Sequence, residues 1–103
     1  MRALGLPPRL RLIADWVPEG AYLADVGTDH GYLPTWLLLR GSIRGAIASD
    51  LRKGPLEHAK ATGALYGVER IDYRLCDGLS GIRIVHANNG KGIETHQCSA
   101  YQP

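Results

Sequence analysis

The 103 residues include no phenylalanine, one methionine and two cysteines. Cys76 and Cys98 are too few for a disulfide-dense secreted scaffold, and no CxxC pair indicates a zinc knuckle. Long apolar runs are also lacking, because the longest aliphatic block, 36–39, is far shorter than the roughly 20 residues of a membrane helix. Neither charge dominates, with 12 Lys+Arg against 10 Asp+Glu. We therefore expect a soluble cytoplasmic protein without a membrane partner.

A metal centre is not expected either. His86, His96 and Cys98 are potential ligands, but they lie in a segment without helical or strand periodicity. The sequence does contain 45% hydrophobic residues and 13 glycines, which indicate one small globular domain with many turns.

Hydrophobic spacing predicts a helix first. Leu6, Leu10, Ile13 and Val17 fall on one helical face, so we expect a helix over Pro8–Val17 with Arg9, Arg11 and Asp15 pointing outward. Strands are predicted at Ala21–Val26, Arg44–Asp50 and Ile71–Cys76, and crossover helices at Tyr32–Arg40 and Pro55–Tyr66. In the second crossover helix, the inner face is predicted to be Leu56, Ala59, Gly63 and Tyr66.

Alternating strands and helices are typical of an α/β fold with a parallel sheet. We expect three parallel strands in the order 3-2-1, an incomplete Rossmann-like arrangement, within residues 1–83. Residues 84–103 are predicted to be a poorly ordered tail that is not homologous to that domain. The outer edge of the first strand is expected to be bare or covered by this tail.

Acidic residues follow each predicted strand. Asp25, near the end of the first strand, and Asp29, in the Gly27–Gly31 loop, flank Gly27; Asp50 ends the second strand, and Asp77 follows the third. Ligands of open α/β sheets bind at the carboxyl ends of the strands, where glycines admit close backbone approach. We therefore expect one polar rim formed by these carboxylates, in which Asp50 accepts hydrogen bonds from ribose hydroxyls.

The loop departs from the GxGxxG fingerprint of dinucleotide sites. Carboxylates on both sides of Gly27 would repel a pyrophosphate, but they suit a ligand with a sulfonium or an amine. This charge pattern favours S-adenosylmethionine over a nicotinamide dinucleotide.

The run Leu23–Pro34, which reads LADVGTDHGYLP, resembles the first motif of the bacterial tRNA (adenine(22)-N(1))-methyltransferases. Lys53-Gly54-Pro55 and Asp77-Gly78-Leu79 are similar to further motifs of that family, and the resemblance covers about residues 4 to 82. It implies a class I S-adenosylmethionine-dependent methyltransferase that modifies N1 of an adenine in tRNA.

The resemblance also implies a donor site, although it names no catalytic residue. The loop around the methionine part would contain Asp25, Gly27, Asp29, His30 and Gly31. The ribose and adenine would contact Asp50, Leu51, Cys76 and Asp77.

Alternatives exist for single residues. Asp25 and Asp50 could instead cap the following helices, and Asp77 could be a turn residue. His30 could be a loop histidine bonded to backbone, and Cys76 a small buried apolar residue.

No residue after Ile82 resembles the glycine-rich acceptor stretch of the family. The sequence therefore predicts the N-terminal half of a methyltransferase, as a truncated reading frame would give. The alternatives are a non-catalytic nucleoside-binding fragment and a nicotinamide-cofactor Rossmann unit. Four arginines, Arg2, Arg9, Arg11 and Arg40, could form an RNA-facing patch or be ordinary solvated charges.

Overall fold

The structure, a computed structural model, describes residues 4–28, 30–76, 82–84, 93–95 and 99–100. Three helices and three longer strands alternate along its first three-quarters. Their bounds are α1 Pro8–Ala14, β1 Ala21–Val26, α2 Tyr32–Leu39, β2 Ile43–Asp50, α3 Lys53–Leu65 and β3 Ile71–Leu75. All six predicted elements are present, with ends that shift by up to three residues.

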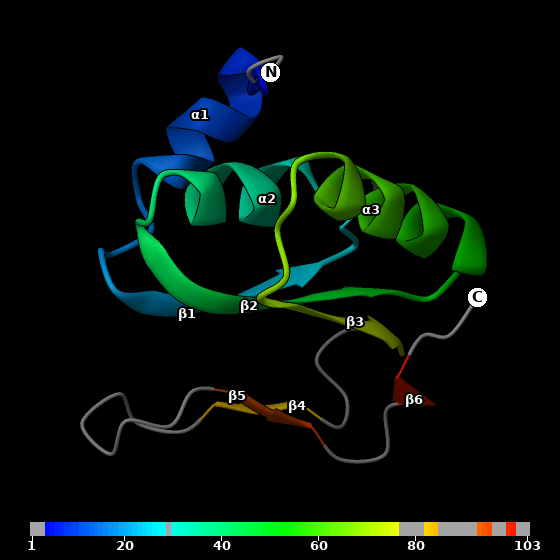
Figure 1. Ribbon diagram of the computed structural model, residues 1–103. Helices are drawn as coiled ribbons and strands as arrows, with labels where there is room; N and C mark the ends of the chain where they lie inside the picture. The colour runs from blue at the N-terminus through cyan, green and yellow to red at the C-terminus, as the bar shows by residue number, and fades with distance from the viewer. Residues whose placement is uncertain (1–3, 29, 77–81, 85–92, 96–98, 101–103) are drawn as a thin grey trace.

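The central sheet is parallel in the predicted order. β1 pairs with β2 and β2 with β3, each pair in parallel, so that β2 lies in the middle. Figure 1 shows α1, α2 and α3 on one side of this sheet. Both crossover helices lie on the same side because the chain moves in one direction, from β1 to β2 to β3, and such crossovers are right-handed.

The core lies between the sheet and the helices. Leu33 and Leu37 of α2 are buried against Ile43, Ala48 and other small and branched residues of β2. On α3, the predicted inner face is confirmed for Leu56, Ala59 and Gly63, which are buried. Tyr66 is only half-buried because α3 ends before it.

α1 is shorter than predicted and buries a different face. It ends at Ala14, which is buried, whereas Ile13 is 48% exposed. Leu10, Ala14 and Val17 follow one another at helical spacing and pack on the core, so the prediction for Ile13 was wrong by one position. Arg9, Arg11 and Asp15 are exposed as predicted.

Three short strands follow: β4 Ile82–Ile84, β5 Ile93–Thr95 and β6 Ser99–Ala100. β6 pairs antiparallel with β3, and β4 pairs antiparallel with β5 on the side of the sheet away from the helices (Figure 1). Among the described residues, no strand pairs with the outer edge of β1. None of the helices in the described part is long and apolar enough to cross a membrane.

Candidate functional site at the carboxyl edge of the sheet

The loop after β1 is fastened to the end of β2. The backbone N–H groups of Gly27 and Thr28 both donate to the carbonyl of Ser49, at 2.8 and 3.0 Å. Cys76, directly after β3, donates its N–H to the carbonyl of Asp50 at 3.0 Å. The three strand ends therefore lie side by side, and the residues predicted for the donor site come from one edge of the sheet.

Asp25 is the last polar residue of β1 and is largely shielded from water. Burial raises the pKa of its carboxyl group above the ordinary value, and a hydrogen bond from Thr28 opposes this increase. That bond runs from Thr28 Oγ1 to Asp25 Oδ2 over 2.7 Å, and Thr28 itself is buried. The geometry therefore holds one carboxylate in a fixed position inside a weakly solvated site, where a cationic ligand group would offset the cost of burying its charge.

Asp25 does not cap the following helix. The N-cap of α2 is Gly31, and no side chain caps it. This rules out the capping alternative that the sequence left open for Asp25.

Gly31 allows α2 to begin close to α3. Its φ is +68°, and a Cβ atom there would lie 2.8 Å from the Cβ and 3.0 Å from the Cα of Ala59. Only glycine combines this backbone conformation with such a close approach. The tight contact keeps the loop and the start of α2 pressed on α3, so the site is bordered by two packed helices.

Asp50 ends β2 and is 9% exposed. Its Oδ1 accepts a hydrogen bond from the backbone N–H of Arg52 at 3.0 Å, and Arg52 Nε lies 3.9 Å from the same oxygen. Since Arg52 is the N-cap of α3, Asp50 contributes to the turn before this helix without being the cap residue. Among the described residues, both contacts of the Asp50 carboxylate use Oδ1 and none uses Oδ2.

His30 belongs to a column of aromatic rings. Its ring is stacked on that of Tyr32, with ring centroids 5.1 Å apart and an angle of 14° between the ring planes. It is also stacked on the ring of His58, with centroids 5.1 Å apart and an angle of 6° between the planes. His58 is exposed, as the sequence predicts for a polar helix face, yet its ring packs against the candidate site.

A cavity of about 340 Å³ opens at the end of β1. This is within the usual range for small-molecule sites, roughly 300–1,000 Å³. It is lined by four of the loop and strand residues and by two helices: Asp25, Gly27, Thr28, His30, then Tyr32 and Leu33 of α2, and Pro7, Arg9 and Leu10 of the α1 region. The N-terminal helix therefore forms one wall of the candidate site.

A larger cavity, about 500 Å³, lies at the opposite end of the strands, between Tyr22, Arg44 and Arg70. It contains neither the glycine loop nor the strand-end carboxylates. Because ligands of such sheets bind at the carboxyl ends of strands, the smaller cavity is the candidate site.

The structure thus brings together Asp25, Gly27, His30 and Gly31, with Asp50, Leu51 and Cys76 along the same edge. Leu51 is 67% exposed and free to cover a ligand, whereas Cys76 is half-buried. Asp29 and Asp77 lie outside the described residues. In the described part, no three potential metal ligands cluster.

Sequence reasoning did not assign seven residues that contribute to the site: Thr28, Tyr32 and Leu33, the α1-region residues Pro7, Arg9 and Leu10, and His58. Thr28 stands three residues after Asp25, a spacing that would have suggested the hydroxyl–carboxylate bond. Arg9, Leu10 and His58 reach the site only through the packing of α1 and α3, and nothing in the local sequence signals this.

A parallel three-stranded sheet with a glycine loop and acidic strand ends is typical of Rossmann-like folds. Residues 6–90 match the methyltransferase domain family, and the chain belongs to this family. The match extends past residue 83, where we placed the end of the domain.

The resemblance to the tRNA (adenine(22)-N(1))-methyltransferases is confirmed. The enzyme of that name from Bacillus subtilis is 39% identical over 84 residues, which cover 81% of this chain and 35% of the relative. The chain thus spans about a third of the length of this curated relative.

Solved structures agree with this assignment. A protein of the NADB-Rossmann superfamily from Streptococcus agalactiae is 45% identical in sequence, and its structure matches with a TM-score of 0.72. The match covers 75% of this chain and 35% of the Streptococcus agalactiae chain. A Streptococcus pneumoniae protein, solved in complex with S-adenosyl-L-methionine, is 43% identical in sequence and matches with a TM-score of 0.70. This match covers 74% of the present chain and 36% of the Streptococcus pneumoniae chain. The predicted Rossmann-like fold is therefore confirmed.

Proposed function

We propose that this chain is the donor-binding part of an S-adenosylmethionine-dependent methyltransferase that modifies N1 of an adenine in tRNA. The observation that carries the proposal is the pair of shielded carboxylates at neighbouring strand ends, Asp25 and Asp50, around a glycine loop. The relationship to the Bacillus subtilis enzyme supports the substrate class. A tRNA substrate also implies a cytoplasmic location.

The residues present fit this donor. Asp25, whose burial raises its pKa, gains from a cationic neighbour, and the donor carries a sulfonium and an ammonium group. Gly27 has a φ of +69°, and the space where a Cβ would stand is open, so a ligand can approach the backbone there. A dinucleotide would instead bring its pyrophosphate against this carboxylate.

Each part of the edge has a separate role in this proposal. Asp25, held by Thr28, and the predicted loop residues Gly27, Asp29, His30 and Gly31 surround the methionine part. Asp50 accepts the ribose hydroxyls with Oδ2, because its Oδ1 already serves the turn before α3.

The adenine would lie between Leu51 and the predicted pair Cys76 and Asp77. When bound, the donor supplies the methyl group that is transferred to the ring nitrogen. The contribution of this chain is to position the donor and shield it from water, because misplacement by about 1 Å can cost 10²-fold in rate.

Titration calorimetry tests the proposal with S-adenosylmethionine and NAD as alternative ligands. We expect binding of S-adenosylmethionine only, and weaker binding by Asp25→Asn. Asp72→Asn is the matched control. Asp72 lies near the amino end of β3, away from the candidate site, and forms an ion pair with Arg74 at 2.9 Å. Preferential binding of NAD, or equal effects of the two substitutions, would contradict the proposed donor site.

A further inference from the structure

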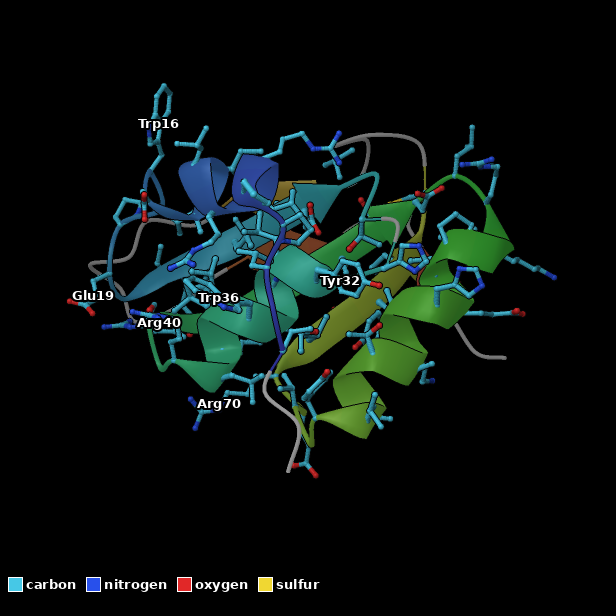
Figure 2. The ribbon with its side chains drawn as sticks, turned by 90° about the horizontal axis from the view of Figure 1, so that it is seen from above. Trp16, Glu19, Tyr32, Trp36, Arg40 and Arg70 are labelled. Atoms are coloured by element: carbon cyan, nitrogen blue, oxygen red, sulfur yellow. The ribbon has the colours of Figure 1, made fainter. Side chains whose placement is uncertain are left out.

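A ridge of large, partly exposed side chains runs along one face of α2, starting at the candidate site. Tyr32, Trp36 and Arg40 are four residues apart and therefore lie on one helical face. Figure 2 shows them in succession along the helix. At the first end, Tyr32 lines the cavity and stacks on His30, so the ridge leads from the donor site to Arg40.

Two guanidinium groups lie over the indole ring of Trp36. The Cζ atom of Arg40 is 4.5 Å from the ring centroid, and that of Arg11, which comes from α1, is 5.8 Å away. Both distances are within the range of cation–π attraction. Because Arg11 and Arg40 come from different helices, the ring brings together two positive charges that the chain separates by almost thirty positions.

These two cations are held in place without being neutralised. In the described part of the chain, the ion pairs join Arg52 to Asp50 and Arg74 to Asp72, and none involves Arg11 or Arg40. Both side chains are exposed. A carboxylate would occupy the N–H donors of a guanidinium, whereas an aromatic face attracts its charge and leaves those donors available.

A preorganised pair of guanidinium groups with open N–H donors matches phosphate oxygens, which accept such bonds in a bidentate manner. Arg9 adds a third positive charge at the cavity itself, which it lines from α1. The positive charge thus extends along α1 and α2 toward the position of the methyl donor, which is the arrangement that a polyanionic substrate requires.

We propose that Arg11 and Arg40, held over Trp36, bind backbone phosphates of the RNA substrate and so orient the target adenine toward the donor site. This inference rests on the proposed function and adds the surface on which the RNA docks. Charge complementarity selects RNA as the occupant, and an acidic protein surface is the competing outcome in the test.

The test compares two double variants of the 103-residue chain by filter binding to an unmodified tRNA transcript between 50 and 200 mM salt. Arg11→Gln/Arg40→Gln removes the proposed pair. Arg44→Gln/Arg70→Gln removes two exposed arginines at the amino end of the strands, and is the matched control for total charge.

We expect the first variant to bind about tenfold more weakly or worse, and the control within about twofold of the parent chain. The slope of log affinity against log salt should fall by about 1.4–1.8 for the first variant, because each phosphate contact contributes about 0.7–0.9. Equal affinities and slopes for the two variants would overturn the proposal.

Fluorescence adds a local readout. The chain has two tryptophans, so Trp16→Phe leaves Trp36 as the single reporter. Figure 2 shows Trp16 projecting away from the ridge, and it is 88% exposed, so its replacement should leave the fold intact. Addition of tRNA should change the Trp36 emission, and binding without any such change would place the RNA elsewhere and overturn the proposal.

Binding of S-adenosylmethionine and binding of polyglutamate separate a failure of the proposed function from a failure of the docking surface. If S-adenosylmethionine fails to bind but tRNA binding depends on Arg11 and Arg40, the proposed function fails and the docking surface stands. If the donor binds and tRNA binding ignores both arginines, the docking surface fails alone. Binding of polyglutamate through these arginines, without binding of tRNA, would replace RNA with an acidic protein partner and overturn the proposal.

Discussion

The contact between Gly31 and Ala59 decides whether the glycine loop is held against α3, and Gly31→Ala tests it. The substitution forces an L residue into a left-handed conformation at φ +68°, which costs about 1–2 kcal/mol. It also places a methyl group 2.8 Å from the Cβ of Ala59, and overpacking of this kind costs about 1–3 kcal/mol. The total of about 2–5 kcal/mol is a large part of the stability of a small domain, about 5–15 kcal/mol.

Gly41→Ala is the matched control. Gly41 has a φ of +70°, but nothing lies within 4 Å of the position of its Cβ, so this variant should lose only the conformational part. In thermal unfolding followed by circular dichroism, we expect the midpoint to fall by about 4–16 °C for Gly41→Ala and by about 8–40 °C for Gly31→Ala.

Ala59→Gly should restore part of the loss in Gly31→Ala, since it removes the nearest atom of the clash. A double-mutant cycle isolates this interaction from the helix propensity of glycine in α3. Equal losses for Gly31→Ala and Gly41→Ala, together with no coupling to Ala59, would refute the close packing of the loop on α3.

Three further outcomes are expected. Asp25→Asn should unfold at higher urea than the parent chain at neutral pH, and its advantage should shrink on acidification. The reason is that burial raises the pKa of Asp25, so the folded state loses stability as pH rises from the unfolded-state pKa through the folded one; an advantage that grows toward acid would contradict this. Asp50→Ala should weaken calorimetric binding of S-adenosylmethionine by about 10–150-fold, the range for loss of a charged hydrogen-bond acceptor, and unchanged affinity would remove Asp50 from the site. The 103-residue chain alone should incorporate no radiolabelled methyl into tRNA, because we find no acceptor stretch after Ile82; incorporation near the rate of a complete enzyme would show an acceptor site that we did not recognise.

The sheet could be predicted from the sequence because its signals are local. Apolar runs bounded by glycines identified β1 with its observed ends, Ala21–Val26, and the alternation of strands and helices fixed the parallel order. The start of α3 was placed at Pro55, two residues too late, because proline suits several positions of a first helical turn and does not fix the first residue.

The part of the site that lies at the strand ends could be predicted from the sequence. Asp25 and Asp50 stand at the ends of their strands, so their juxtaposition follows once the sheet is parallel. The contributions of Arg9 and His58 depend on how α1 and α3 pack, which pattern and spacing do not encode. The same reason explains Ile13, because which face of α1 is buried, here the one with Ala14, depends on how the helix packs on the core.

The cation–π pair at Trp36 also required coordinates. Arg11 and Arg40 were visible in the sequence only as charges that could equally be solvated. Their shared contact with one ring comes from α1 crossing α2, and it turns two surface charges into one defined feature.

The most direct test of the donor site is an amide chemical-shift titration of the 103-residue chain with S-adenosylmethionine, up to millimolar concentrations so that weak binding is detected. We expect shifts at Gly27, His30, Gly31 and Leu51, on the carboxyl edge of the sheet. Tyr22, Arg44 and Arg70, which line the larger cavity at the other end, should not shift. Shifts confined to those three residues, or none at saturating donor, would contradict the assignment of the donor site.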